Sequence, residues 1–487
     1  MTRARRPLRV SQHFRLGRTQ AELDFVDVDV TGDTRVFISP TAIRLMDTPW
    51  SGQCLSLVQD FFQEVLDSIK ARKHARAEYL LSTLREPNET HLGLSKGPAR
   101  GRTLGPQSAH DMWEALSKSA AVRSGLLQDL EETILMIDGV GPDIVSDITT
   151  NIIREPLIQY TQEACEYYGI PTYRLDSGPL WNSQTKAWTN RFELQPMYND
   201  VKILLVPKTI VRRHPVYDAD YYLRHYVLEY LKEVEESSPG SDLVRILKDG
   251  TRKGIKYKVR ERYGFDDDKK RAIADQTILK PELLDEYRAD RDKETPPLTH
   301  SEIAGAAHAA APDWDALLHA VTSLRTGTAD ADAYEKAIEG LLSALFYPSL
   351  VHPQRQRKKN NGRKRIDITY STRGNGDFFE WVRKNYVAPY FLVECKNYKN
   401  EIGNPELDQL IARFAPSHGK VGLLVCRKIE NRALLAQRCR DAAKDGQGYI
   451  IALDDADLTS LVAAAKGQWL AANDFQLLRD KFDALVF

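Results

Sequence analysis

The strongest constraint on the fold is a short apolar stretch that carries two opposite charges, residues Phe391–Tyr398 (FLVECKNY). Pro389 precedes it and a polar cluster around Lys399 follows it, which is typical of a short buried strand. Because successive side chains on a strand alternate faces, Glu394 and Lys396 point the same way. Burying two charges on an apolar strand is costly without partners, which favours a metal or a phosphate beside them.

A second predicted strand, Arg365–Tyr370, carries Asp367 between two isoleucines that face the opposite side. If the two strands pair, Asp367 and Glu394 form a carboxylate pair with Lys396 beside it. Hard oxygen ligands of this kind suit Mg²⁺ or Mn²⁺ rather than zinc. Such a metal polarises a phosphoryl oxygen and lowers the pKa of a bound water, while Lys396 orients that water or offsets charge on the phosphate.

The order of the motifs resembles the PD-(D/E)XK nuclease superfamily, and within it the Mrr-type restriction endonucleases, over roughly residues 330–460. The pieces in order are an acidic helix (Tyr334–Leu342), Asp367, the Glu394-Cys395-Lys396 motif, a helix with Gln409 (Pro405–Ile411) and a strand (Val421–Val425). One departure is Ile366, which stands where the name of the signature would put a proline. The resemblance is therefore to an order of elements rather than to one motif.

The resemblance implies a restriction-endonuclease-like α/β core, with a central mixed sheet flanked by helices. It implies that Asp367 and Glu394 bind the metal, with the carbonyl of Cys395 as a third ligand, and that Lys396 serves the attacking water. Glu335 on the preceding helix, or Glu339 one turn on, would be an outer metal or water contact. Gln409 would be a supporting polar group.

A run of basic residues leads into the strand that carries Asp367. Residues 355–365 contain seven basic and no acidic side chains: Arg355, Arg357, Lys358, Lys359, Arg363, Lys364 and Arg365. We interpret the run as a basic loop that neutralises phosphates beside the scissile bond, although a solvated turn between two strands is the alternative. The whole chain has 68 basic and 68 acidic residues, so its net charge gives no indication of a nucleic-acid partner.

Three further segments have compositions that suit phosphate contacts. The glycine-rich residues 93–105 carry three cations but lack the ending of a P-loop, so a plain loop is the alternative. Residues 137–148 resemble a helix-hairpin-helix turn, yet Asp143 and Asp147 are unfavourable for DNA, and a helix start set by Gly141-Pro142 is the interpretation that we favour. Residues 245–271 hold eleven Lys/Arg against five Asp/Glu, and either track a nucleic-acid backbone or form a solvated helix pair.

The length of 487 residues predicts two to four domains. We expect an α/β domain for recognition or regulation (residues 1–215, with strands at 22–30 and 201–206), a helical, basic middle segment (216–300) and a nuclease domain (301–487). No run of about 18 apolar residues occurs, so no membrane span is expected. Five scattered cysteines predict no disulfide framework and favour the reducing cytoplasm.

These patterns predict a Mg²⁺-dependent endonuclease that hydrolyses phosphodiester bonds, with DNA favoured over RNA and defence against foreign DNA as its biology. Three alternatives stay open at this point. Glu394 and Lys396 form an ordinary salt bridge on a solvated side of the sheet, the domain is a catalytically silent or gated nucleic-acid-binding regulator, or the protein is an RNA-cutting toxin. A homo-oligomer or an activating partner is compatible with each of them.

Overall fold

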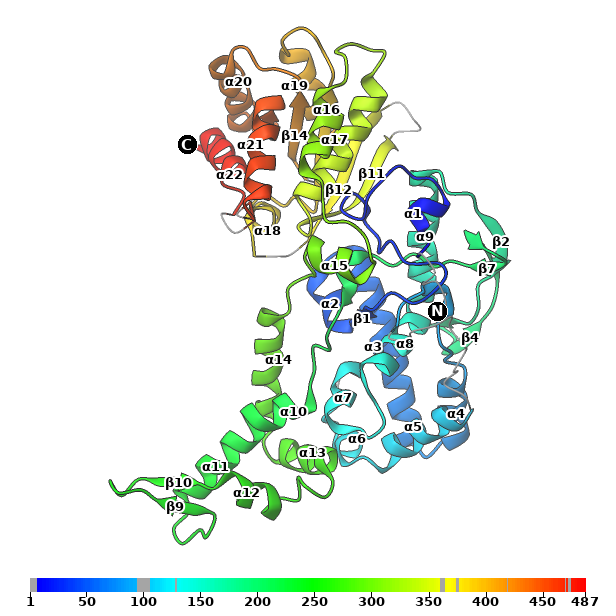
Figure 1. Ribbon diagram of the computed structural model, residues 1–487, viewed down its shortest axis with the longest axis vertical. Coiled ribbons are helices and arrows are strands. Elements are labelled where there is room, and N and C mark those ends of the chain that lie inside the picture. Colours follow the sequence, from blue (N-terminus) through cyan, green and yellow to red (C-terminus); the bar gives the residue numbers. More distant parts are fainter. Residues whose placement is uncertain are drawn as a thin grey trace, which may run out of the picture.

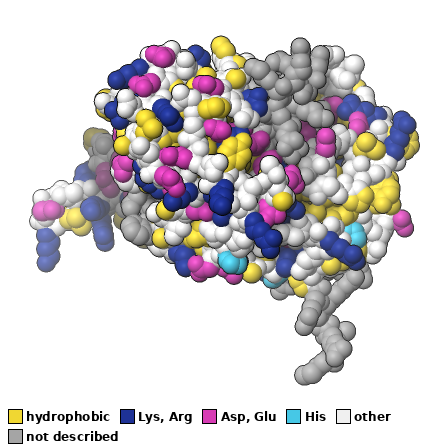
Figure 2. Space-filling view, turned by 90° about the horizontal axis from the view of Figure 1, so that it is seen from above, with side chains coloured by type: hydrophobic (Ala, Val, Ile, Leu, Met, Phe, Trp, Pro, Cys, Tyr) yellow, Lys and Arg dark blue, Asp and Glu magenta, His cyan; other side chains and the backbone are white. Residues whose placement is uncertain are grey.

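The computed structural model describes residues 7–93, 106–127, 129–359, 364–373, 376–417, 419–468, 470–471 and 474–487, and Figure 1 shows their arrangement. Within these ranges no helix combines the length and the apolar character needed to cross a membrane. Charges of both signs are interspersed over the face seen in Figure 2. That face therefore has no large region of a single charge.

Two hydrophobic cores organise the chain. The first is built from side chains between Val10 and Ala306, joined by Tyr347 and Val351. The second is built from side chains between Leu317 and Leu485. The first core continues without a break across residue 215, so the middle segment packs on the N-terminal part, and the division predicted at residue 215 stays a prediction.

The N-terminal part is mainly helical around α3 (Pro49–Lys70). Thr48 caps this helix with Pro49 as its first residue, and one face of it, from Cys54 to Ile69, is buried. The other helical elements are α1 (Val10–His13), α2 (Pro40–Met46), α4 (His74–Ser82), η1 (Asn88–Thr90), α5 (Pro106–Lys118), α6 (Ala120–Ser124), η2 (Leu130–Glu132), α7 (Thr133–Met136), α8 (Pro142–Ile152), α9 (Arg154–Tyr168) and η3 (Lys208–Ile210).

The strands of this part form four antiparallel pairs rather than one sheet. They are β1 (Phe37–Ile38) with β8 (Val211–Arg212), β2 (Tyr173–Asp176) with β5 (Phe192–Gln195), β3 (Leu180–Asn182) with β4 (Ala187–Thr189), and β6 (Met197–Tyr198) with β7 (Val201–Lys202). The strand expected at 22–30 does not form, and the one expected at 201–206 is only the two residues of β7. In these two segments the buried backbone groups form single hydrogen bonds to different parts of the chain instead of a ladder to one strand. For example, the Leu204 N–H donates to the Glu89 carbonyl.

The middle segment consists of short helices and one two-stranded ribbon. Its helices are α10 (Ala219–Tyr222), the π-helical η4 (Leu223–Val227), α11 (Leu228–Ser237), α12 (Lys256–Arg262), α13 (Lys269–Leu279), α14 (Glu282–Glu294) and α15 (His300–Ala306). The ribbon pairs β9 (Val244–Ile246) with β10 (Arg252–Gly254) and projects from the body of the molecule at the lower left of Figure 1. The buried tyrosines Tyr217, Tyr222 and Tyr287 join this segment to the first core.

The C-terminal part is built on a five-stranded mixed sheet, which confirms the expected mixed α/β class. The strand order is β11 (Leu350–Lys359), β12 (Lys364–Thr372), β13 (Tyr390–Lys396), β14 (Val421–Cys426) and β15 (Tyr449–Leu453). The first three strands are antiparallel, and β13, β14 and β15 are parallel. The helices of this part are α16 (Trp314–Thr322), α17 (Ala331–Leu345), α18 (Phe378–Asn385), α19 (Asn404–Ile411), α20 (Arg432–Lys444), α21 (Asp455–Lys466) and α22 (Gln476–Val486).

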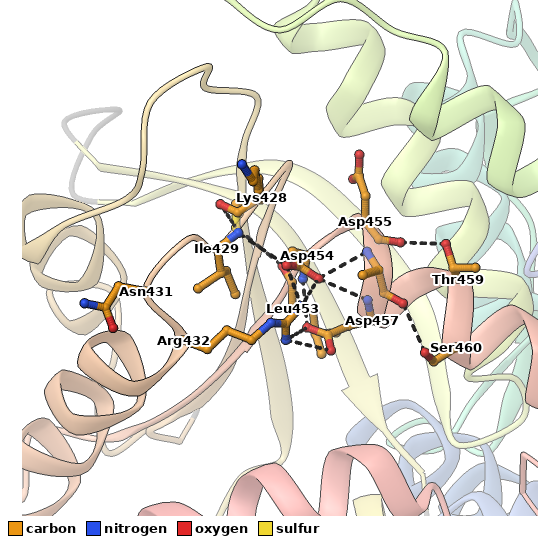
Figure 3. Close-up of polar contacts among 12 residues, drawn as sticks. Lys428, Ile429, Asn431, Arg432, Leu453, Asp454, Asp455, Asp457, Thr459 and Ser460 are labelled. Carbon is orange, nitrogen blue, oxygen red and sulfur yellow. Dashed lines mark hydrogen bonds and ion pairs between the residues drawn. The ribbon is translucent and has the colours of Figure 1, made fainter.

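A polar network fixes three of these helices at the end of β15 (Figure 3). Asp454 caps α21 by accepting hydrogen bonds from the backbone N–H groups of Ala456 and Asp457. The Arg432 guanidinium, from α20, donates to the carboxylates of both Asp454 and Asp457. Lys481 of α22 adds an ion pair to Asp457 at 3.1 Å. The network therefore sets the positions of α20, α21 and α22 relative to the sheet.

Residues 15–25 connect the two parts. The Arg18 guanidinium forms an ion pair with Glu339 and donates to the Lys336 carbonyl at 3.1 Å, both on α17. Asp24 accepts a hydrogen bond from the backbone N–H of His352 at 2.9 Å and another from the Tyr160 hydroxyl at 2.8 Å. Residues 15–25 are thus attached to α17 and to β11, the first strand of the C-terminal sheet.

Candidate active site

The pairing of β12 with β13 brings Asp367 and Glu394 together. Ile368 pairs with Val393, and one position further along this register Asp367 comes opposite Glu394. Directly opposed residues of an antiparallel pair project from the same face. Asp367 also accepts a hydrogen bond from the backbone N–H of Cys395 at 2.9 Å, which holds its carboxylate against β13.

Glu394 is a fully buried carboxylate with one oxygen unsatisfied. Its exposed fraction is 0%, and its Oε1 accepts a hydrogen bond from Lys396 Nζ at 2.9 Å. Its Oε2 is buried and has no hydrogen-bond partner among the described residues. Burial, followed by the charge of Asp367, raises the pKa of Glu394 against the opposing effect of Lys396. An oxygen buried without a partner is costly, and a divalent cation is a suitable partner for it.

Lys396 is held by two side chains. Its Nζ donates to Glu394 Oε1 at 2.9 Å and to Gln409 Oε1 at 2.8 Å. Burial disfavours its charged form, but the charges of Glu394, Tyr398 and Asp367 outweigh burial and raise the pKa of Lys396. The side chain is therefore an ammonium at neutral pH. An ammonium has three N–H donors, and the third has no acceptor among the described residues.

The two glutamates of α17 are both buried and both paired with arginines. Glu335 Oε1 accepts a hydrogen bond from Arg355 Nε at 3.2 Å, and Glu339 pairs with Arg18. Burial, followed by the charges of Asp367, Glu335 and Glu394, raises the pKa of Cys395 well above its usual value. Glu335 is therefore within electrostatic reach of β13, whereas Glu339 is engaged in the contact between the two parts.

The donor set is compatible with a metal that uses few protein ligands. Among the described residues no group of three or more His, Cys, Asp and Glu side chains is arranged to hold a metal ion. Asp367 and Glu394 offer two carboxylates on one face, and one of them has an orphaned buried oxygen. Mg²⁺ commonly takes one or two carboxylates and completes its shell with water and phosphate oxygens. The residues present fit that ion.

The sequence analysis missed Arg413 and Tyr398. The charge of Arg413 lowers the pKa of Glu394, and the Tyr398 ring centroid lies 5.7 Å from Lys396 Nζ with 43% of the residue exposed. The signal for Arg413 was its position just after the helix with Gln409, which ends at Ile411. The signal for Tyr398 was its position two residues after Lys396, on the same face of an extended chain.

The basic run is a strand hairpin, which corrects the interpretation as a loop. Arg355, Arg357, Lys358 and Lys359 belong to β11, and Lys364 and Arg365 belong to β12. Arg363 lies outside the described residues, and of the seven side chains only that of Arg355 is described. The physical reason is backbone pairing, because β11 is an edge strand of the sheet and pairs with β12 up to Lys359 opposite Lys364. Arg355 itself is paired with Glu335 and, at 3.0 Å, with Asp332.

Two other sequence candidates have different outcomes. The start of α8 has Gly141 as its N-cap, in agreement with a helix start set by glycine and proline. Burial, followed by the charges of Glu86, Asp143 and Asp33, raises the pKa of Asp147 to about 8, so this helix lies in acidic surroundings that do not favour a phosphate. The glycine-rich loop lies outside the described residues except for Gly93.

A cavity of about 630 Å³ lies between the two parts, and its lining does not include Asp367 or Glu394. Carboxylates dominate its polar lining, with Asp24, Glu163, Glu166 and Asp332 against His352 and Arg355. Such a lining repels phosphate groups. The cavity is therefore a poor channel for a nucleic-acid backbone.

Comparison with known proteins yields one family. The model of a domain of unknown function, DUF8370, matches residues 15–218. No curated protein and no solved structure shows significant similarity to the chain. The family match covers the N-terminal part that packs against α17 and does not include the candidate active site.

Proposed function

We propose that the C-terminal part is a metal-dependent nuclease of the PD-(D/E)XK type that hydrolyses phosphodiester bonds of DNA. The observation that carries the proposal is Glu394, a buried carboxylate with an unsatisfied oxygen, opposite Asp367 and bonded to the Lys396 ammonium. An isolated salt bridge on a solvated face would leave none of these groups buried. The order α17, β11–β12 hairpin, β13, α19 and β14 supports the proposal, because it is the order that the sequence resemblance implies.

In this proposal Asp367, Glu394 and the Cys395 carbonyl hold Mg²⁺ or Mn²⁺. When bound, the metal supplies Lewis acidity and lowers the pKa of a coordinated water. Lys396 is oriented by Glu394 and Gln409, so its remaining N–H is available for the attacking water or a phosphate oxygen. Together these groups must lower the barrier by well over roughly 10 kcal/mol, because uncatalysed phosphodiester hydrolysis is very slow.

Gln409 is a positioning residue in this scheme. It accepts a hydrogen bond from the Lys396 ammonium and is held on α19, whose first turn is closed by the hydrogen bond from the Gly403 N–H to Glu406. The carboxamide binds the ammonium without adding a charge, so it fixes the direction of Nζ and leaves the charge of the site unchanged.

A gated form of the enzyme is favoured by one observation. Arg355, the described member of the basic run, is already paired with Glu335 and Asp332, so a substrate phosphate has to compete with two carboxylates for it. The N-terminal part contacts the same helix through Arg18. We infer that this part recognises a target or restrains the nuclease, and that its biology is defence against foreign DNA by analogy with similar fusions.

The test is cleavage of plasmid DNA, single-stranded DNA and RNA by the purified full chain with Mg²⁺, Mn²⁺ or EDTA. We expect metal-dependent cleavage that falls at least about 100-fold in Lys396→Ala and in Asp367→Ala. Lys399→Ala is the matched control, since Lys399 is exposed three residues further along, and it should retain activity.

Each outcome has a definite meaning. Cleavage that persists in Lys396→Ala would place the chemistry elsewhere. Cleavage of RNA alone would favour the toxin alternative. If wild type cuts no substrate, calorimetry with Mg²⁺ and Mn²⁺ decides, because binding that is lost in Asp367→Ala indicates a gated nuclease and the absence of binding indicates a silent fold.

A further inference from the structure

The projecting β9–β10 ribbon is a separate structural feature, far along the chain from the candidate active site. Its strands pair only with each other, and the turn between them is closed by the Leu247 N–H donating to the Thr251 carbonyl at 2.8 Å. One face rests on α11, where Gly254 lies against Lys232 and its N–H donates to Glu236 at 2.7 Å. The ribbon is thus held at its base and free at its tip.

The outer face of the ribbon carries two like charges directly opposite each other. The register pairs Arg245 with Lys253, and both side chains are exposed. Like charges at directly opposed positions destabilise a strand pair. A ribbon that keeps this arrangement is better explained by an anion that binds between the two cations than by its own stability.

Two more cations extend this surface. Lys248 lies in the turn and Lys256 lies at the start of α12, and both are exposed. Among the described residues, Arg245, Lys248, Lys253 and Lys256 have no ion-pair partner. Neighbouring arginines differ, since Arg260 pairs with Asp266 at 2.6 Å and Arg262 pairs with Asp242 at 3.3 Å. The unpaired cations are therefore a subset gathered on the ribbon and its exit, which we call the ribbon patch.

We propose that the ribbon patch binds the phosphate backbone of duplex DNA. Four cations outnumber the one carboxylate of this turn, Asp249, which interacts with Lys253, and the net positive charge complements a regularly spaced polyanion. A two-stranded ribbon also has the width that the major groove admits. Exposed Tyr257 (66%) lies next to Lys256 and provides an apolar contact to sugars or base edges, whereas Ile246 projects from the face opposite to Arg245 and Lys253. This inference rests on the proposed function, because it assigns the ribbon to the same DNA that the C-terminal part cleaves.

The position of the ribbon defines what it contributes. In Figure 1 the ribbon and the C-terminal sheet lie at opposite ends of the long axis of the molecule. In Figure 2 the segment that projects at the left bears Lys and Arg side chains along its edge. A duplex held at both ends would lie along the long axis. The ribbon patch therefore adds affinity and orientation away from the cleavage site, without taking part in the chemistry.

The test compares two quadruple variants in a Lys396→Ala background with EDTA, so that cleavage cannot interfere. The ribbon variant carries Arg245→Gln, Lys248→Gln, Lys253→Gln and Lys256→Gln. The matched control makes the same change of charge at exposed positions elsewhere, with Lys70→Gln, Arg72→Gln, Lys73→Gln and Lys444→Gln. Affinity for a short fluorescent duplex is measured by anisotropy between about 50 and 200 mM salt. Circular dichroism and thermal melting verify that both variants fold.

We expect the ribbon variant to bind DNA at least about 10-fold more weakly. The magnitude of the slope of log affinity against log salt concentration should fall by about 2 to 4, since each lost phosphate contact removes about 0.9 from that slope. The control should stay within about 2-fold of the parent. Equal affinity and slope in both variants would overturn the inference. So would ribbon-dependent binding to vesicles of phosphatidylserine and phosphatidylcholine without ribbon-dependent binding to DNA.

The cleavage and calorimetry tests of the wild type, run beside this binding assay, separate the inference from the proposed function. If DNA binds through the ribbon patch but the wild type shows neither metal-dependent cleavage nor Mg²⁺ binding, the nuclease proposal fails and the ribbon inference stands. If DNA is cleaved and binding does not depend on the ribbon patch, only the ribbon inference fails.

Discussion

The ion pair between Arg18 and Glu339 predicts a large and specific loss of stability. Both side chains are buried, with 5% and 0% exposed, and they lie 321 positions apart in the chain. Without Arg18, Glu339 keeps, among the described residues, the hydrogen bond from Ser343 Oγ at 2.9 Å and the more distant charge of Lys208. Breaking a buried pair by removing one partner typically costs about 3–5 kcal/mol, because the remaining charge is uncompensated. We expect Arg18→Met, which preserves the apolar stem, to fall in that range.

A double variant isolates the electrostatic part of this loss. Replacing both charges by apolar groups of similar volume is often nearly neutral, so Arg18→Met with Glu339→Met should recover most of the loss and remain within about 1–2 kcal/mol of wild type. The coupling free energy between the two sites should then exceed about 2 kcal/mol. The exposed pair of Lys466 and Asp315 is the control, and Lys466→Met should cost less than about 1 kcal/mol.

The assay is hydrogen exchange of the α17 amides, followed by mass spectrometry. This measurement reports the free energy of local opening and does not require the whole chain to unfold in a single step. A loss of less than about 1 kcal/mol of stability in Arg18→Met would refute the reasoning, because a buried carboxylate without its ion-pair partner should destabilise the fold by more than that. A double variant as unstable as the sum of the single variants would refute it equally.

Three further predictions concern stability. Burial, followed by the charge of Lys208, lowers the pKa of His300 to about 3, so as the pH falls below 6.5 the unfolded chain binds a proton that the folded chain does not, and stability falls. Wild type should lose about 1–2 kcal/mol of stability between pH 6.5 and 5. His300→Gln should show a flatter pH profile of thermal midpoints. Gly448→Ala should lower the stability measured by thermal denaturation by roughly 2–3 kcal/mol, since φ is +144° and the new Cβ would meet the Phe414 ring. Gly446→Ala, whose new Cβ would have no other atom within 4 Å, should lower it by about 1 kcal/mol. Asp454→Ala should cost about 1–2 kcal/mol and speed hydrogen exchange in the first turn of α21, because it removes the cap; an unchanged rate would show that Asp457 caps the helix alone.

The candidate site could be anticipated from the sequence because its information is local. Residues 365–370 and 391–396 are short strands with charges at fixed spacing, so alternation alone assigns Glu394 and Lys396 to one face. Gln409, on the helix after β13, was expected only from the family resemblance. In the structure Lys396 contacts Glu394 and Gln409, and Asp367 contacts the backbone of Cys395.

What the sequence could not provide depends on distant partners. Residues 22–30 alternate like a strand, but the Asp27 carboxylate accepts hydrogen bonds from Ser11, and the segment pairs only at isolated bridges. Arg355 belongs to a basic run, yet its guanidinium forms an ion pair with Glu335. Such outcomes are decided by which segments pack together, and local periodicity contains no information on that.

The contact between Arg18 and Glu339 has a consequence for how the protein is made. The two residues are 321 positions apart. At typical rates of synthesis, roughly 15 to 60 seconds pass between their emergence from the ribosome. During that interval Arg18 has Glu22, four residues along the chain, as its ion-pair partner. Docking of Arg18 on α17 is therefore a late event in biogenesis. The rest of the segment can pack earlier, because Leu23 and Phe25 belong to the first core and Asp24 accepts a hydrogen bond from Tyr160.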